Sequence, residues 1–523
     1  MTLQTEMHPQ RWGDPEAATS LPESARGLIE LAFGLADCSP VAGATPPSSA
    51  IAADALAALA DVVGPDHVLA DDATRALRTR GKSTADLLKA RAGDLSDAPD
   101  VVVRPGGQAE VEALLAVATA RRLAVVPFGG GTSVTGGLVA ARGGFDGVVS
   151  LDLVRMKALV AVDKESMTAT LEPGLRGPEA EALLAEHGLT LGHYPQSFEF
   201  ASIGGYAATR SSGQSSAGYG RFDSLVMAMT VVTPSGTITV GSAPATAAGP
   251  DLRQVFLGSE GAFGVITAVT VRVRPVPEVK LYLGWRWPSF VVGADAMRAL
   301  AQADLLPTVL RLSDEAETAI NLADPAAIGG IDDPGCLMIT GFEGTPSAVA
   351  AKRAAVTSVL TELGGTDLGE QPGQAWAHGR FNAPYLRDAL LDVGVLVETL
   401  ETATFWSNRS RLYVEVKTAL ETSLGEGSIV LCHISHVYET GCSLYFTIAA
   451  KESADPLAQW AAAKVAASEA MIEAGATITH HHAVGTDHKP WLEREIGPVG
   501  VQTLRAIKDS LDPSGILNPG VLV

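Results

Sequence analysis

The chain has 523 residues, more than one ordinary domain holds, so two or three domains are expected. The net charge of −21 argues against a nucleic-acid partner, because nucleic acids are bound by basic faces. It also argues against broad docking on anionic lipid, so an anionic substrate would need a local basic pocket.

The four cysteines show neither zinc-ligand spacing nor a redox pair, which indicates free thiols of a reducing compartment. Residues 1–12 lack a signal pattern, no apolar run is long enough to span a membrane, and 521–523 is not a peroxisomal address. We therefore expect a cytoplasmic protein with at most peripheral membrane contact.

Residues 1–96 are predicted to be helical and irregular. One apolar helix face is predicted there, formed by Leu28, Ile29, Ala32, Phe33 and Leu35. The segment Gly81-Lys82-Ser83-Thr84 imitates the end of a nucleotide-binding P-loop. We reject a P-loop because position 76 is Ala rather than Gly, and because a helix rather than a strand is predicted before it.

From about residue 97 short strands alternate with helices, which predicts an α+β domain. Strands are predicted at 101–103, 123–126, 148–151, 159–162, 168–171, 225–233, 237–240 and from 265 onward. Helices are predicted at 178–187, at 251–257 and around the inward face Val111, Leu114, Leu115 and Ala118.

A glycine-rich segment, Pro127-Phe128-Gly129-Gly130-Gly131-Thr132-Ser133, follows the predicted strand 123–126. Glycines let the backbone approach a ligand and point N–H groups at it, so the segment is a candidate diphosphate cradle. An ordinary tight turn remains the alternative. It is not a Rossmann turn, because Val134 stands where the last glycine is required.

A second polar region, 195–220, is predicted to be a long loop that forms another wall of a cofactor site. Beyond residue 278 the pattern predicts an antiparallel sheet with helices on one face, acting as a cap. Its predicted strands are 281–287, 308–312, 336–342, 429–436 and 442–450, and its predicted helices are 346–363 and 455–474. A final helix is predicted at 499–511, followed by a closing loop at 511–520.

Residues 97–277 resemble the FAD-binding domain of the vanillyl-alcohol oxidase type, and the ending at 512–520 resembles FAD-linked oxidases generally. From about residue 97 onward the chain is similar to the alkyldihydroxyacetonephosphate synthase family, flavoenzymes of ether-lipid synthesis. The motifs that carry this similarity are Ser197-Phe198-Glu199-Phe200, Gly204-Gly205, Thr209-Arg210, Arg311-Leu312, Tyr385-Leu386-Arg387-Asp388, Gly441 with Tyr445-Phe446, His480-His481-His482-Ala483-Val484-Gly485 and Trp491-Leu492.

The resemblance implies an α+β fold with a two-part FAD-binding domain at 97–277 and an α+β cap domain with an antiparallel sheet at 278–500. An N-terminal helical region at 1–96 precedes them, and a C-terminal helix and loop at 501–523 returns to the flavin site. The family also suggests a homodimer.

The resemblance also implies FAD ligands in the glycine-rich segment and in three further stretches. They are Pro127, Phe128, Gly129, Gly130, Gly131, Thr132, Ser133, Gln196, Ser197, Phe198, Glu199, Phe200, Ala201, Ser202, Thr209, Arg210, Ser211, Ser212, Glu260, Gly261, Ala262, Phe263, Gly264, Val265 and Ile266. Covalent flavin attachment in the wider family commonly uses a histidine in or near these loops. The glycine-rich segment has none, so non-covalent FAD is predicted.

The implied reaction exchanges the acyl group of acyl-dihydroxyacetone phosphate for a long-chain fatty alcohol, giving alkyl-dihydroxyacetone phosphate. A flavin N5 adduct would carry the substrate carbon without net redox change. The partners implied are therefore a phosphorylated lipid substrate and a fatty alcohol. In this scheme Arg387 holds the substrate phosphate, and Tyr445 is the acid/base residue.

Alternation along 444–448 places Leu444, Phe446 and Ile448 on one face and Tyr445 with Thr447 on the other. Tyr445 is either an acid/base residue or a packed sheet tyrosine. As a base it needs nearby positive charge, because a phenol titrates near about 10.

On an extended backbone His480 and His482 would face one way and His481 the other, so no metal site is predicted. Proton transfer near the flavin and a merely polar cluster both remain open. Arg311 is either catalytic or a structural ion pair, and Arg387 either binds phosphate or pairs on the surface.

The main rival is an FAD-dependent 2-hydroxy-acid dehydrogenase of the same superfamily. Those enzymes often carry Gly-Asp-Gly-Asn-x-His, whose histidine binds a metal, and a Glu-His pair before Gly. Here Tyr445 stands in place of that histidine, and His481-His482-Ala483 replaces the Glu-His pair, so both departures favour the synthase. A flavin-binding scaffold without catalysis is the second rival.

Overall fold

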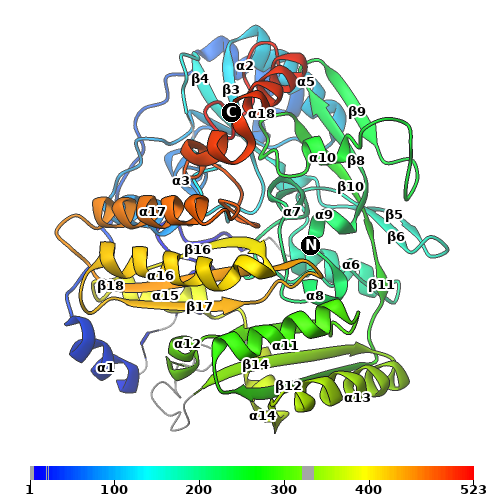
Figure 1. Cartoon of the computed structure of the whole chain (residues 1–523). Coiled ribbons are helices and arrows are strands. Elements are labelled where there is room, and N and C mark those ends of the chain that lie inside the picture. The colour runs from blue at the N-terminus through cyan, green and yellow to red at the C-terminus, as the bar shows by residue number, and fades with distance from the viewer. Residues whose placement is uncertain (1–4, 19, 22, 140, 321–334) are drawn as a thin grey trace.

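The computed structural model describes residues 5–18, 20–21, 23–139, 141–320 and 335–523 (Figure 1). Its first unit is a four-stranded sheet of order β1-β2-β4-β3, in which β2, β4 and β3 are parallel. The strands are β1 (Val68–Leu69), β2 (Val101–Val103), β3 (Leu123–Phe128) and β4 (Gly147–Asp152). Helices α2 (Ala53–Val63) and α5 (Gln108–Ala120) share its core, and the predicted inward face of α5 is buried.

The second unit is a five-stranded antiparallel sheet of order β5-β6-β10-β8-β9. Its strands are β5 (Leu159–Asp163), β6 (Thr168–Leu171), β8 (Val226–Thr233), β9 (Gly236–Val240) and β10 (Val265–Arg272). A two-stranded pair, β7 (Leu189–Thr190) with β11 (Arg274–Pro275), and helices α6 (Gly177–Ala185) and α10 (Arg253–Phe256) complete this unit. The predicted hairpin at 225–240 is confirmed.

The prediction of one long loop at 195–220 is wrong in its second half. Three short helices lie there or just beyond, α7 (Ile203–Thr209), α8 (Ser216–Tyr219) and α9 (Phe222–Leu225). The Ser202 side chain caps α7 by accepting from the Gly205 N–H at 3.3 Å, and Ile203, Tyr206 and Ala207 are fully buried. A cap and a buried apolar face therefore overcame the low helix propensity of the two glycines.

The third unit is a seven-stranded antiparallel sheet of order β15-β12-β14-β13-β17-β18-β16, which confirms the predicted cap architecture. Its strands are β12 (Val279–Trp287), β13 (Val309–Ser313), β14 (Cys336–Gly344), β15 (Thr366–Gly369), β16 (Val395–Phe405), β17 (Ile429–Ile434) and β18 (Gly441–Lys451). Strand β16 was not among the predicted strands, because Glu398, Thr399, Glu401 and Thr402 interrupt its apolar pattern.

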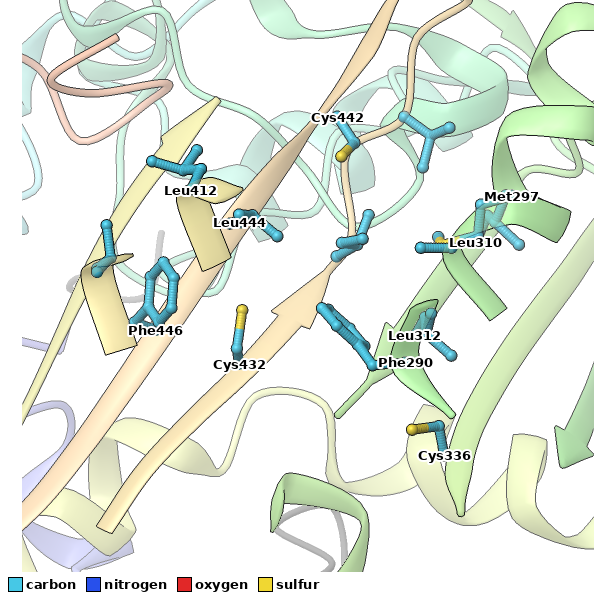
Figure 2. Close-up of a cluster of buried hydrophobic side chains, with 14 of the residues drawn as sticks. Phe290, Met297, Leu310, Leu312, Cys336, Leu412, Cys432, Cys442, Leu444 and Phe446 are labelled. Atoms are coloured by element: carbon cyan, nitrogen blue, oxygen red, sulfur yellow. The ribbon is translucent and has the colours of Figure 1, made fainter. Parts of the chain in front are cut away.

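Four helices, α11 (Phe290–Gln302), α13 (Pro346–Glu362), α16 (Arg409–Leu424) and α17 (Pro456–Glu473), contribute to the core on one face of this sheet (Figure 1). Figure 2 shows part of this core, including Leu444, Phe446 and the thiols of Cys336, Cys432 and Cys442. Shorter helices are α12 (Glu315–Ile320), α14 (Gln371–Gly379) and α15 (Ala383–Leu391). All four cysteines are free thiols, as expected.

The two ends of the chain attach to these units. At the C-terminal end, α18 (Lys489–Leu511) breaks at Gly497, and the tail then pairs with β3 through Val125 and Leu517. The N-terminal helices are α1 (Glu23–Phe33), α3 (Asp72–Leu77) and α4 (Thr84–Arg91). The predicted apolar face of α1 is only partly buried, since Phe33 is 8% exposed but Leu28 is 45% exposed. Among the described residues, no helix combines the length and the apolar character that crossing a bilayer requires.

Candidate active site

One cavity of about 1040 Å³ lies between the loops of the first two units and the face of the seven-stranded sheet opposite the helices. Ligand pockets span about 300–1,000 Å³, so this space lies at the upper end and has room for a large ligand such as a dinucleotide cofactor. Residues of the glycine-rich segment, of 195–212 and of β13, β16, β17 and β18 all line it.

The glycine-rich segment and the second predicted wall pack backbone against backbone. A Cβ on Gly129 would lie 2.3 Å from Ser202 Oγ, and one on Gly130 would lie 2.0 Å from the Phe200 carbonyl oxygen. Gly131 has a φ of +70°, which other residues rarely adopt. These glycines are therefore needed to bring the two segments together at the cavity wall.

Glu260 connects this wall to the backbone just after the histidine segment, residues 480–482, and to the C-terminal tail. Its buried carboxylate accepts the N–H groups of Val484 and Gly485, and burial raises its pKa to about 7. The Asn518 amide donates to the carbonyls of Gly137 and Glu260 at 3.0 and 2.7 Å. Glu260 thus organises the backbone in addition to lining the cavity.

The predicted cofactor residues divide into two groups. Those that line the cavity are Pro127, Phe128, Gly129, Gly130, Gly131, Thr132, Ser133, Gln196, Ser197, Ala201, Ser202, Thr209, Ser211, Ser212, Glu260, Gly261, Gly264 and Ile266. Those that lie outside its lining are Phe198, Glu199, Phe200, Arg210, Ala262, Phe263 and Val265. Arg210, for example, donates to the carbonyls of Leu257 and Gln254 and pairs with Asp223.

The lining group suits FAD. Backbone amides beside glycines are diphosphate ligands, and the hydroxyls of Thr132, Ser133, Ser202, Ser211 and Ser212 can bond ribityl or ring atoms. The close approach at Gly129 and Gly130 keeps that backbone free of side chains. The residues present therefore fit the cofactor.

Opposite this wall, three side chains stand in one row across adjacent strands of the cap sheet. Tyr445 on β18 pairs in register with Glu401 on β16 and with His433 on β17. The Tyr445 and His433 rings stack with centroids 4.7 Å apart. Arg311 donates from Nη1 to His433 Nε2 at 3.2 Å, because His433 Nδ1 donates to the Glu317 carboxylate. Arg311 also pairs with Glu317, so the arginine belongs to an ion-pair network and lines the cavity as well.

The histidine segment curls around one buried carboxylate. Glu401 accepts the backbone N–H groups of His480, His481 and His482 at 2.7, 3.1 and 2.9 Å. The predicted extended arrangement is therefore wrong: His481 and His482 both line the cavity, whereas His480 does not. Although burial alone would raise the pKa of Glu401, attraction to His481 and the other histidines holds that pKa well below its ordinary value.

Burial dominates the pKa values of Tyr445 and His482, in contrast to that of Glu401. It raises the pKa of Tyr445 to about 12, outweighing the opposite effect of Arg311, so the expected lowering by positive neighbours is not found. Burial also lowers the pKa of His482 to about 3, with Glu401 opposing the shift. At neutral pH the cavity thus presents a protonated phenol beside a neutral imidazole.

Two histidines that the sequence interpretation did not single out, His433 and His436, belong to the site. His436 Nδ1 lies 3.0 Å from Ser212 Oγ and 2.7 Å from Ser216 Oγ. With His480 and His481 it forms the group of described residues whose ligand atoms lie within 4.8 Å of one another, the spacing a metal ion would need. The sequence did offer a signal for this site: two histidines three residues apart, one on strand β17 and one just after it.

Three further cationic side chains line the cavity, Lys82 and Arg387, which contact each other, and Arg380. Arg387 donates from Nη1 to the Lys82 carbonyl at 2.7 Å, while its buried Nη2 has no hydrogen-bond partner in the described part of the chain. The guanidinium of Arg380 lies 5.0 Å from the Tyr194 ring centroid. This is the local basic pocket that an anionic substrate would need in a strongly acidic protein.

The comparisons with known proteins first define a class. The FAD binding domain family matches residues 99–242, and the family of FAD linked oxidases, C-terminal domain, matches residues 276–522. The chain is thus an FAD-dependent enzyme with the two-part flavin fold and antiparallel cap that were predicted.

Alkyldihydroxyacetonephosphate synthase of Dictyostelium discoideum is 33% identical over 88% of this chain and 79% of its own length. A solved structure of alkyldihydroxyacetonephosphate synthase superposes with a TM-score of 0.85 at 29% identity, covering 99% of both chains. A mitochondrial D-lactate dehydrogenase of Arabidopsis thaliana is 30% identical over 81% of this chain and 73% of its own length. The chain belongs to the alkyldihydroxyacetonephosphate synthase family, and the predicted resemblance is confirmed.

Proposed function

We propose that this enzyme exchanges the acyl group of acyl-dihydroxyacetone phosphate for a long-chain fatty alcohol. The observation that carries the proposal is a single cavity that joins the flavin wall, a group of buried cations and an apolar stretch. A phosphorylated lipid needs the last two together, because its two ends differ in polarity.

The phosphate end is assigned to Arg387. Its Nη2 is buried, lines the cavity and has no hydrogen-bond partner among the described residues, so a ligand oxygen can satisfy it. A guanidinium matches the geometry of phosphate oxygens. The alternative expected for Arg387, an ion pair, is also present, since its Nε lies 3.5 Å from Asp388 Oδ1, but the pair is buried instead of lying on the surface and leaves Nη2 for a ligand.

The hydrocarbon end is assigned to an apolar stretch between α1, α15 and the cap sheet. Phe33, Val395 and Val397 are its buried members, and Ile29 and Leu390 pack against them. All five line the cavity, and the exposed Leu28 and Leu31 lie at the same side. Burying an alkyl chain there contributes about 0.8 kcal/mol per methylene.

Exchange at the substrate carbon requires a proton to leave and return. His433 lies nearer to Tyr445, but both of its ring nitrogens already contact Arg311 or Glu317. We therefore assign the acceptor role to His482, which is neutral at working pH and lines the cavity with its ring centroid 5.6 Å from that of Tyr445. Tyr445 keeps its proton and donates it to the oxygen of the departing acid, and the entering alcohol returns a proton to Tyr445 when its own oxygen bonds the substrate carbon. FAD, when bound, would supply the ring chemistry for the exchange, and the lining residues of 127–133 and 196–202 would hold it.

A stepwise experiment tests this function. Purified holoenzyme is mixed anaerobically with acyl-dihydroxyacetone phosphate while the flavin absorbance is recorded, and fatty alcohol is then added. We expect a change in the flavin spectrum in the first step and alkyl-dihydroxyacetone phosphate in the second. No product with either order of addition would contradict the proposal.

The same preparation tests the dehydrogenase alternative. A 2-hydroxy acid that reduces the flavin and passes electrons to a dye, without alkyl product in the exchange assay, would identify the enzyme as a dehydrogenase. We expect no dye reduction, because Tyr445 occupies the row where a metal-binding histidine would be needed.

A further inference from the structure

The segment Gly81-Lys82-Ser83-Thr84, rejected above as a P-loop, lies against the glycine-rich segment of the flavin wall. The Lys82 N–H donates to the Ser133 carbonyl at 2.7 Å. A Cβ on Gly81 would lie 2.1 Å from that same carbonyl oxygen, so only glycine permits the contact. Residue 82 is therefore fixed at the cavity wall although it is not part of a P-loop.

The Lys82 ammonium is buried and has no carboxylate in direct contact among the described residues, although Asp388 and Asp86 act on it from a longer distance. The residue is 6% exposed and lines the cavity. Its Nζ donates to the carbonyls of His8 and Pro9 at 2.5 and 3.3 Å, and no carboxylate in the described ranges lies within 4.0 Å of it. Two neutral acceptors leave one of the three ammonium protons for a ligand. A buried cation without an anion is unfavourable, so the site favours an anionic occupant.

Lys82 and Arg387 are linked through the backbone. The Lys82 carbonyl accepts from Arg387 Nη1 at 2.7 Å, which fixes the guanidinium while Nη2 stays unpartnered among the described residues. The neighbouring Asp388 carboxylate accepts the Trp12 N–H, and its other oxygen lies 3.5 Å from Arg387 Nε. The N-terminal region thus supplies one cation and positions the other.

We propose that Lys82 is a second cationic residue of the phosphate subsite that was assigned above to Arg387, and that it binds the phosphate monoester of the substrate. The proposal rests on the function given above for the identity of that monoester. Lys82 supplies a compact charge, and Arg387 supplies directed donors, a combination that suits a dianion. It also gives residues 1–96 a role in substrate binding.

The same phosphate chemistry has a second source, the diphosphate of FAD, because Lys82 touches Ser133. A third possibility is a purely structural role, in which the ammonium only holds residues 8 and 9 in place. The experiment must separate these outcomes from each other and from failure of the exchange reaction.

The test compares Lys82→Met, Lys82→Arg and the control Lys89→Met, which lies on α4 outside the cavity lining. For each holoenzyme we measure FAD affinity, melting temperature, KM for both substrates and binding of inorganic phosphate by calorimetry. For Lys82→Met we expect KM for the phosphorylated substrate and the Kd of phosphate to rise by roughly tenfold to a hundredfold, as for loss of a charged hydrogen bond. FAD affinity and KM for the alcohol should match the control, and Lys82→Arg should retain most of the binding.

Three results would overturn the proposal. Weakened FAD binding with unchanged phosphate binding would assign Lys82 to the cofactor. A lowered melting temperature with unchanged KM and phosphate affinity would leave Lys82 only the structural role of holding residues 8 and 9. Equal phosphate binding, or none, in wild type and Lys82→Met would remove the subsite. If exchange activity is absent but Lys82→Met still loses phosphate binding, the subsite stands and the proposed function fails.

Discussion

The two faces of the seven-stranded sheet come from the same strands and do different work. On one face Leu444, Phe446 and Ile448 pack against helices in a predominantly apolar core. On the other face Glu401, Tyr445 and His433 form a row beside the cavity. Because side chains alternate along a strand, one step along β18 leads from the core into the site. Substitutions of Tyr445 and Phe446 can therefore be compared to separate effects on catalysis from effects on stability.

The largest effect is expected for Tyr445→Phe. Removing the hydroxyl deletes a proton donor but keeps the ring that stacks on His433, so turnover should fall by about 10²–10⁴-fold. FAD content and melting temperature should match the wild type. Steady-state exchange rates and flavin absorbance provide the measurement, and undiminished turnover would refute the role given to Tyr445.

The neighbouring change Phe446→Ala should act on stability instead. It opens a cavity in a fully buried core, so the free energy of unfolding should fall by about 3–5 kcal/mol. Urea denaturation measures this loss. In the fraction that remains folded, KM for both substrates should be unchanged, and a selective rise in either KM would show that the two faces are not independent.

Glu401→Gln tests the support of the row. The amide has donors where three backbone N–H groups need acceptors, so unfolding free energy should fall by about 1–3 kcal/mol. Because the pKa of Glu401 is depressed in the fold, its stabilisation is present above its ordinary pKa and lost as pH falls through the folded value. As the pH falls, the unfolding free energy of the wild type should thus decrease by a contribution from Glu401 that the variant does not have. Parallel pH–stability curves for the two proteins would contradict this.

The smallest effect is expected at alkaline pH. Burial lowers the pKa of Lys82 to about 8, with Asp388 and Asp86 opposing and Arg387 adding to the shift. Since the phosphate subsite needs the ammonium, kcat/KM for the phosphorylated substrate should decline above about pH 8, by at most about tenfold per unit. Lys82→Arg should lack this decline, because arginine stays protonated. If the Lys82→Arg variant shows the same decline in kcat/KM above pH 8, the decline is caused by a group other than Lys82.

Much of this arrangement could be predicted where local rules decide it. The period of two in β18 separated Tyr445 from Leu444, and the helical period identified the inward face of α5. The lining of the cavity by the glycine-rich segment also agreed with expectation. In each case the feature depends on residues close together in the sequence.

The errors arose where a distant residue decides. The direction of the three histidine rings depends on Glu401, which lies on the unpredicted strand β16. The pKa of Tyr445 depends on how deeply the cap covers it. Lys82 was compared with one motif only, while its ammonium is positioned by the carbonyls of His8 and Pro9, which no local pattern connects to it.

The pairing of Leu517 with Val125 has a consequence for biosynthesis. The bridge joins β3, which leads into the flavin wall, to the last turn of the chain. At roughly 5–20 residues per second, a ribosome delivers the tail tens of seconds after the strand it completes. Until then Gly137 and Glu260 lack the Asn518 amide that ties them together. The contacts that hold Gly137 and Glu260 in place therefore cannot be complete before the chain has been synthesised past residue 518.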